Sequence, residues 1–200
     1  MKALAPVMDH VTAYRLWQAP FAERKLEPVL RHNRVTEMRR VLDVGCGPGT
    51  NARHFAHADY LGVDMNPDYI AYARRRFGDR FAVEDVTRMG TPAGGAFDAI
   101  LVNSLLHHID DANSRRILAH LAKLLTDDGH VHILDLVLPD NPSLARWIAR
   151  SDRGDHPRPL AAWREMFAGA FEPVLFEPYP LGIGGVTLWN MVYFKGRRRP

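Results

Sequence analysis

The sequence contains a single cysteine, Cys46, so an internal disulfide bond is excluded and a reducing compartment is expected. It has no apolar stretch that approaches the roughly 20 residues of a membrane-spanning helix. Its first residues, Met1–Val11, lack the apolar core of a secretory signal peptide. These absences predict a soluble, cytoplasmic protein with no membrane partner.

A strong excess of one charge is also missing, because the formal net charge is only +3 over 200 residues. We interpret the basic runs Arg74–Arg76 and Arg197–Arg199 as a solvated helix end and a tail. A nucleic-acid-binding surface needs a broader basic face with interleaved aromatic residues, so no nucleic-acid partner is expected. The ten histidines show no metal-ligand spacing with cysteine or carboxylates, so no metal site is expected either. The length predicts one domain over residues 1–200.

Short apolar runs recur through the middle of the chain, and each ends at a glycine or a polar residue. Such runs are typical of parallel strands that are buried on both faces. The runs are Val41–Val44, Tyr60–Val63, Phe81–Val83, Phe97–Val102 and His130–Leu134. Helical segments are expected between them at residues 50–57, 67–77 and 111–125. This alternation predicts a doubly wound parallel sheet with right-handed crossovers.

The two ends of the chain add to this core. Residues 1–38 are expected to form an N-terminal helical cap, and residues 138–160 a segment that covers the substrate. A helix over residues 160–168 and strands over 171–179 and 187–194 complete the pattern. The predicted fold is therefore α/β, a Rossmann-like doubly wound, mostly parallel seven-stranded sheet with one antiparallel edge strand.

The clearest motif is Val41–Thr50, a strand that runs into a glycine-rich loop. Glycines let the backbone approach a ligand closely, and both dinucleotides and S-adenosylmethionine use such loops. Gly45 and Gly47 fit the first two positions of the dinucleotide motif G-x-G-x-x-G, but Thr50 stands at the third. Asp43, at the strand end, is suited to accept a hydrogen bond from the ammonium group of an amino acid. The spacing favours S-adenosylmethionine.

Acidic residues also follow the next two strands. Asp64 ends the second strand, where a carboxylate would accept hydrogen bonds from both ribose hydroxyls. Asp85 follows the third strand, where it would accept from an adenine amino group. Because the carboxyl ends of parallel strands meet at one edge of the sheet, Asp43, Asp64 and Asp85 are expected to share a ligand-binding edge.

These residues resemble the class I S-adenosylmethionine-dependent methyltransferases over about residues 38–136. Val41–Thr50 is similar to the first motif of that family, and Phe97–Asp110 is similar to the motif around its fourth strand. The resemblance implies that the methionine part, the ribose, the adenine and the region near the sulfonium each have their own contacts. Cys46, which fits the tight turn, is counted with them. The implied cofactor-binding residues are Asp43, Gly45, Cys46, Gly47, Asp64, Met65, Asp85, Val86 and Asn103.

Two histidines follow the fourth strand, where the methyl acceptor is expected. A neutral imidazole at His107 or His108 is suited to take a proton from an acceptor hydroxyl or amine. The pattern at His108 is similar to that of phosphoethanolamine-type methyltransferases, in which such a histidine assists catalysis with an N-terminal tyrosine, and Tyr14 is the candidate here. The alternative is that both histidines only shape the loop, because the sulfonium is already activated and placement alone supplies much of the rate.

The leading hypothesis is therefore methyl transfer from S-adenosyl-L-methionine to an oxygen, nitrogen or carbon atom of a small-molecule acceptor. A nicotinamide-dependent oxidoreductase and a non-catalytic cofactor-binding protein remain as alternatives. Methylation of DNA bases is disfavoured, because Asn103–Leu106 lacks the Pro-Pro-aromatic run of those enzymes. The acceptor and the oligomeric state are not specified by the sequence.

Overall fold

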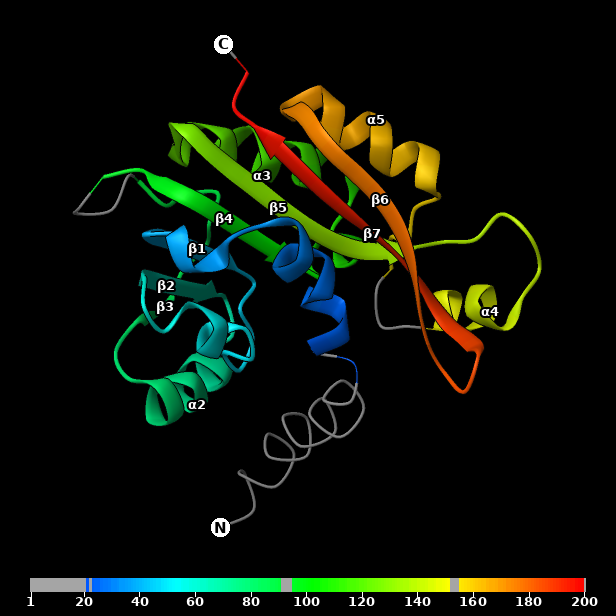
Figure 1. The fold of residues 1–200 in the computed structure, drawn as a ribbon, viewed down its shortest axis with the longest axis horizontal. Coiled ribbons are helices and arrows are strands. Elements are labelled where there is room, and N and C mark those ends of the chain that lie inside the picture. The colour runs from blue at the N-terminus through cyan, green and yellow to red at the C-terminus, as the bar shows by residue number, and fades with distance from the viewer. Residues whose placement is uncertain (1–20, 22, 91–94, 152–154, 200) are drawn as a thin grey trace.

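The computed structural model describes residues 21, 23–90, 95–151 and 155–199, which form one seven-stranded sheet (Figure 1). The strand order is β3-β2-β1-β4-β5-β7-β6. The strands are β1 (Arg40–Val44), β2 (Asp59–Asp64), β3 (Phe81–Val83), β4 (Phe97–Asn103), β5 (Leu125–Val137), β6 (Glu172–Ile183) and β7 (Val186–Arg197).

Strands β1 to β5 are parallel to one another, and β7 is antiparallel to both β5 and β6. The predicted seven-stranded, mostly parallel α/β sheet is confirmed. The antiparallel strand β7 lies one position in from the edge, and β6 forms the edge itself. The reason is that β6 and β7 form a hairpin whose second strand inserts beside β5.

Helices and 3-10 turns connect the strands. Besides an N-terminal helix, the described residues include the α-helices α2 (Pro67–Phe77), α3 (Asp111–Leu124), α4 (Leu144–Ser151) and α5 (Leu160–Ala170). The 3-10 helices are η1 (Val35–Glu37), η2 (Ala52–Phe55) and η3 (Leu106–His108). Of the predicted N-terminal cap, residues 23–32 are helical, whereas residues 1–20 and 22, including Tyr14, lie outside the described residues.

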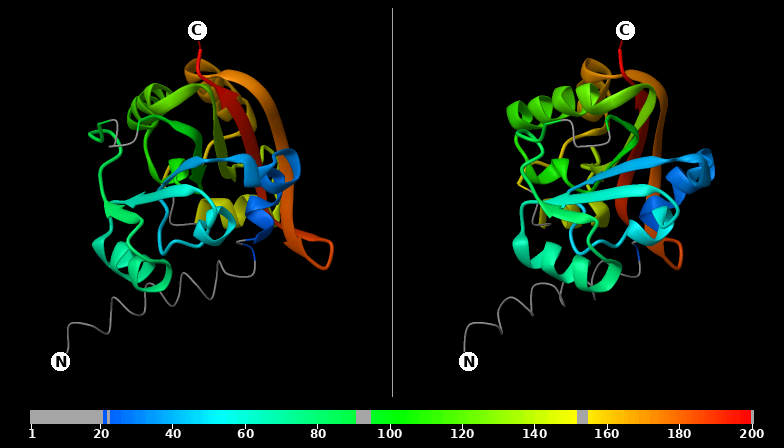
Figure 2. Two further views of the ribbon diagram at one scale, coloured as in Figure 1. Left: turned by 60° about the vertical axis from the view of Figure 1, so that its left-hand side comes forward. Right: turned by 90° about the vertical axis from the view of Figure 1, so that its left-hand side faces the viewer.

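Alternate side chains of the central strands enter two separate hydrophobic clusters, as the two-residue period of a strand requires. Leu42 and Ile100 pack in the cluster that contains α3 and α5. Val41 and Leu101 pack in the cluster that contains Leu26 from the N-terminal helix. The sheet therefore lies between two layers, and Figure 2 shows α3 and the N-terminal helix on opposite sides of it.

The helix predicted over residues 50–57 is only the short 3-10 helix η2. Asn51 precedes it but makes no side-chain capping hydrogen bond. Its side chain instead donates from Nδ2 to Asp43 Oδ2 at 3.2 Å. The first crossover is therefore a short 3-10 turn, and Asn51 ties the start of this turn to the buried carboxylate.

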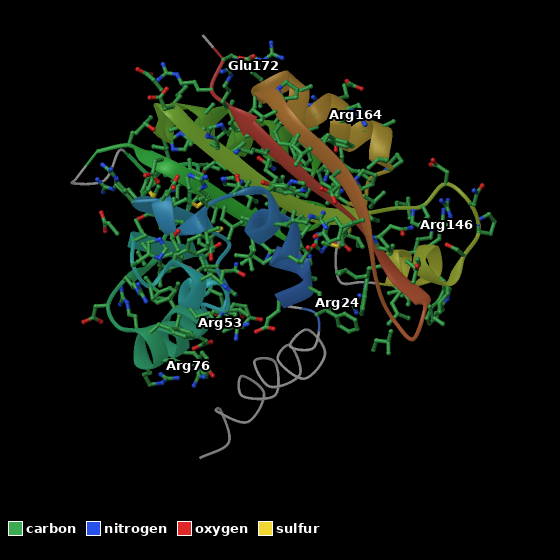
Figure 3. The ribbon with its side chains drawn as sticks, in the orientation of Figure 1. Arg24, Arg53, Arg76, Arg146, Arg164 and Glu172 are labelled. Atoms are coloured by element: carbon green, nitrogen blue, oxygen red, sulfur yellow. The ribbon has the colours of Figure 1, made fainter. Side chains whose placement is uncertain are left out.

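The basic side chains are spread over separate elements. Figure 3 shows Arg24, Arg53, Arg76, Arg146 and Arg164 at different places around the molecule. Several of them make local contacts: Arg53 pairs with Glu23, and Arg24 and Arg146 donate to the carbonyl oxygens of Gly182 and Pro139. In the described part of the chain, no helix is both long enough and apolar enough to span a bilayer.

Candidate functional site

A cavity of about 230 Å³ lies at the carboxyl ends of β1, β2 and β4. Six residues that the sequence predicted meet there: Gly45, Gly47, Asp64, Asn103, His107 and His108. The sequence did not point to the other lining residues, because most of them come from the N-terminal helix, α2, β5 and β7. These are Lys25, Tyr69, Ser104, Leu105, Leu136, Trp189 and Met191.

The loop after β1 exposes its backbone to this cavity. Gly45, Gly47 and Gly49 have φ values of 68°, 53° and 80°, in the left-handed region that favours glycine. The N–H groups of Gly45 and Cys46 donate to Val63 O at 2.8 and 3.0 Å, which fastens the loop to β2. A Cβ atom built on Gly47 would meet no heavy atom within 4 Å, so the space above this residue is open to a ligand.

Asp64 holds the loop from the end of β2. Its Oδ2 accepts from the N–H of Gly47 at 2.9 Å, and its Oδ1 accepts from the N–H of Asn66 at 2.8 Å. A carboxylate offers about four lone-pair sites, so acceptor capacity remains on the cavity side. Asp64 therefore lines the cavity with a carboxylate that has further capacity to accept hydrogen bonds.

Asp43 lies behind the loop and does not line the cavity. Its fully buried carboxylate accepts at Oδ2 from Tyr60 Oη at 2.7 Å and from Asn51. Its Oδ1 is buried without a hydrogen-bond partner among the described residues. Burial raises the pKa of Asp43 from 3.8 to about 7, against the opposing effect of the two hydrogen bonds. A buried acceptor without a partner is costly, and a donor supplied by a ligand would satisfy it.

Cys46 is a buried thiol inside the loop and does not line the cavity. Its Sγ contacts Gly47 O at 3.6 Å. Burial, and then the charges of Asp43 and Asp64, raise the pKa of Cys46 well above its usual range. The thiol therefore stays protonated and acts as a small packing group.

The residues assigned to the adenine do not line the cavity. Met65 is 72% exposed, and Val86 is buried. Asp85 Oδ1 accepts from Thr87 N at 2.9 Å and from Thr87 Oγ1 at 2.7 Å, and these bonds lower the pKa of Asp85. Of the three acidic residues expected at one edge, only Asp64 opens onto this cavity.

His107 forms a buried pair with a residue that the sequence analysis did not name as functional. Its Nδ1 lies 2.6 Å from Oδ1 of Asp135, whose side chain is fully buried at β5. The rings of His107 and His108 are 4.0 Å apart, and His108 is the exposed one. The available signal was that Asp135 interrupts an apolar run at the end of a predicted strand.

Arg158 fixes the loop that carries both histidines. It donates to the carbonyl oxygens of Leu106 at 2.8 Å and Ile109 at 2.6 Å, and it pairs with Asp111 at 2.7 Å. Its guanidinium also lies 4.7 Å from the centre of the Trp163 ring. No signal in the sequence identified this residue, because its partners are mostly backbone atoms.

A chain of polar side chains crosses the edge of the sheet and reaches the N-terminal helix. Lys25 Nζ donates to Ser104 Oγ at 3.1 Å, and Ser104 Oγ donates to Asn103 Oδ1 at 3.2 Å. Asn103 Nδ2 then donates to Asn51 Oδ1 at 3.5 Å, which leads to Asp43. Ser104 has a φ of 57°, so the backbone is strained at the point where the chain meets the cavity.

The donor and acceptor groups present fit an adenosyl amino acid. The space above Gly47 is open, Asp64 offers oxygens to hydroxyl groups, and a buried oxygen of Asp43 has no partner among the described residues. These features lie at the carboxyl ends of neighbouring parallel strands, where open α/β sheets bind their ligands. The fold is the doubly wound sheet that the resemblance to class I methyltransferases predicted.

Comparison with known proteins finds a methyltransferase domain in part of the chain. Residues 41–129 match the family model described as a methyltransferase domain. An uncharacterized methyltransferase of Mycobacterium tuberculosis is 34% identical over 118 residues, 54% of this chain and 58% of the relative. Trans-aconitate 2-methyltransferase of Afipia carboxidovorans is 28% identical over 175 residues, 78% of this chain and 62% of the relative. The chain thus spans less than two thirds of these relatives.

Solved structures share the fold. The N-methyltransferase NodS of Bradyrhizobium japonicum superimposes with a TM-score of 0.68 at 16% identity, covering 90% of this chain and 98% of NodS. YcgJ of Bacillus subtilis superimposes with a TM-score of 0.66 at 18% identity, covering 89% of this chain and all of YcgJ. These comparisons support a class I S-adenosylmethionine-dependent methyltransferase, and NodS was also solved in complex with S-adenosyl-L-homocysteine.

Proposed function

We propose that this protein transfers the methyl group of S-adenosylmethionine to an oxygen or nitrogen atom of a small molecule. The observation that carries the proposal is one cavity lined by the glycine loop, by Asp64 and by the two histidines after β4. The residues proposed to bind the cofactor and the histidines proposed to face the methyl acceptor thus line the same cavity. The match of residues 41–129 to the methyltransferase domain supports the same reaction.

The residues of this chain have distinct proposed roles toward the cofactor. Asp64 accepts from the ribose hydroxyls, and the loop from Gly45 to Gly47 admits the methionine part close to the backbone. Asn103 contributes near the sulfonium. When bound, the cofactor supplies an activated methyl group, so the protein has mainly to align the acceptor with it. Asp43 is proposed to compensate the ammonium group from behind the loop.

The adenine contacts remain proposals on the neighbouring strand. β3 pairs in parallel with β2, so Asp85 follows the strand next to the one that Asp64 ends. Val86 comes directly after Asp85, and Met65 comes directly after Asp64. We propose that Asp85, Met65 and Val86 bind the adenine beyond the edge of the 230 Å³ cavity.

The acceptor is proposed to bind against the apolar side chains of the cavity. Leu136, Trp189 and Met191 come from β5 and β7, and Lys25 adds a positive charge from the N-terminal helix. This lining suits a small acceptor that carries an anionic group. The name of the Afipia relative specifies aconitate, a carboxylate. Residues 1–38 and 138–160 are proposed to cover the bound acceptor.

Two measurements test the proposal. Isothermal titration calorimetry should show binding of S-adenosylhomocysteine and none of NADH, because Thr50 replaces the third glycine of the dinucleotide motif. Binding of NADH without binding of S-adenosylhomocysteine would instead support an oxidoreductase. Transfer of a labelled methyl group should then be measured across a panel that includes trans-aconitate, a phenol and a primary amine. Cofactor binding without product on a broad panel would favour a non-catalytic role.

A further inference from the structure

We propose that His107 is the proton acceptor of the reaction and that Asp135 is the residue that positions it. Asp135 holds the proton of the neutral imidazole on Nδ1, which leaves Nε2 unprotonated and open to the cavity. The inference rests on the proposed function and assigns separate roles to the two adjacent histidines.

The contacts of Asp135 decide which nitrogen of His107 carries the proton. Its Oδ2 accepts from the N–H of Leu106 at 2.8 Å, and its Oδ1 accepts from the N–H of Leu136 at 2.7 Å. Each oxygen of this buried carboxylate thus already accepts one backbone hydrogen bond. Because an ionised carboxylate only accepts hydrogen bonds, the Nδ1 atom of His107, 2.6 Å from Oδ1, must be the donor.

The second ring nitrogen of His107 is left for the acceptor. Nε2 has no hydrogen-bond partner in the described part of the chain. Among the described residues, the fully buried side-chain nitrogen and oxygen atoms without a partner do not include Nε2 of His107, so this atom is accessible. Since the residue is only 4% exposed and lines the cavity, its accessible nitrogen is reached from the cavity.

The ring and its loop are held in place before any substrate arrives. Arg158 binds the carbonyl oxygens of Leu106 and Ile109, on either side of the histidines. The N–H of His156 donates to the carbonyl oxygen of His107 at 2.9 Å. A base that is already oriented saves the entropy of orienting it in the transition state. His108 is exposed rather than buried against a carboxylate, so it is assigned to lining the cavity.

The proton balance then follows for an acceptor with a hydroxyl or an amine. The bond from the acceptor atom to the methyl carbon forms as the carbon–sulfur bond breaks, and the electron pair of that bond stays on sulfur. The proton of the acceptor moves to Nε2 of His107. The resulting imidazolium is stabilised by the Asp135 carboxylate, while Lys25, His108 and Asp64 are further ionisable groups of the cavity.

Histidine NMR tests the inference directly and needs no knowledge of the acceptor. Long-range ¹H–¹⁵N correlation spectra of the S-adenosylhomocysteine complex at pH 8 should show His107 neutral, with the proton on Nδ1. The signal is assigned by its loss in His107→Gln. His132 is an internal reference, because burial lowers its pKa to about 3 and keeps it neutral from pH 5 to 8. A proton on Nε2, or a cationic His107 at pH 8, would overturn the assignment.

The variant Asp135→Ala tests the positioning role. It removes both carboxylate oxygens, so no side-chain acceptor at position 135 faces His107 Nδ1. We expect the proton of His107 to shift to Nε2, with S-adenosylhomocysteine affinity within about twofold of wild type, since the ribose contacts are untouched. An unchanged tautomer in a folded variant would overturn the role of Asp135. If the variant does not fold, the wild-type spectrum remains decisive.

Different results would contradict the proposed function and the assignment of His107 and Asp135. Loss of S-adenosylhomocysteine binding by the wild-type protein would contradict the proposed function as a whole. Intact binding with the proton on Nε2 of His107 would contradict only the assignment of His107 and Asp135.

Discussion

The buried carboxylate of Asp43 makes a measurable prediction about stability. Its side chain is fully buried, and Oδ1 has no partner among the described residues. Burial raises the pKa of Asp43 from 3.8 to about 7 in the folded protein. The substitution Asp43→Asn keeps the size and one oxygen for Tyr60 and Asn51 but cannot ionise. The difference between the two proteins therefore isolates the cost of charging this site.

The sign follows from proton linkage. A raised pKa means that the folded state binds the proton more tightly than the unfolded chain, so the stabilising effect of that proton is full below pH 3.8 and is lost as the pH rises through 7. Between pH 5 and pH 8.5 the wild type should lose about 2–3 kcal/mol relative to Asp43→Asn, at about 1.4 kcal/mol per pKa unit. In this window the Asp43→Asn variant should become relatively more stable as the pH rises.

Urea unfolding followed by tryptophan fluorescence at pH 5 and pH 8.5 measures this difference. The wild type alone would not isolate the effect of Asp43, because His132 also makes stability depend on pH. Its pKa is lowered to about 3 in the folded protein, so the folded protein loses stability as the pH falls below 6.5. Both proteins contain His132, so its contribution cancels in the comparison. A difference in unfolding free energy that stays constant from pH 5 to 8.5 would refute the reasoning about Asp43.

Asp64→Ala should weaken S-adenosylhomocysteine binding by about 1–3 kcal/mol in calorimetry, because hydroxyl donors lose their acceptor. Asp127→Ala, an exposed carboxylate of β5 that does not line the cavity, is the matched control, and equal losses in both would contradict the placement of the ribose at Asp64. Gly47→Ala should cost about 1–2 kcal/mol of stability at its φ of 53° and weaken ligand binding further by filling the open space; unchanged binding would remove this loop from the site. Relative to the wild type, His132→Gln should gain about 2 kcal/mol of stability as the pH falls from 7.5 to 5, and a difference that stays constant in urea titrations would contradict the role of His132.

The sequence predicted the central sheet because its strands are buried on both faces. Val41 and Leu42 enter different clusters, so the run is continuously apolar. The position of β7 was not predictable, because its insertion between β5 and β6 depends on pairing between distant segments. The hydrogen bond from Asn51 to the buried carboxylate of Asp43, eight positions earlier, was likewise not indicated by the pattern of apolar residues.

The candidate site was predictable where its chemistry lies in the loop after a strand. Gly47, Asp64 and His107 lie at strand ends, and the topology brings strand ends to one edge. The prediction that Asp43 and Asp85 share a cavity with Asp64 is not supported by their positions. Asp43 is buried, and Asp85 accepts a hydrogen bond from Thr87. Both depend on how side chains pack in the folded protein, which the pattern of strand residues does not indicate.

The contact between His107 and Asp135 could not be predicted from the sequence. The two residues are 28 positions apart, and nothing in their spacing indicates contact. The register of β4 and β5 creates it, because Asn103 pairs with Leu134 and places Asp135 beside the start of the loop. A shift of one residue in this register would turn Asp135 to the other face of the sheet. The carboxylate would then lie away from the histidine, and the tautomer of His107 would no longer be fixed.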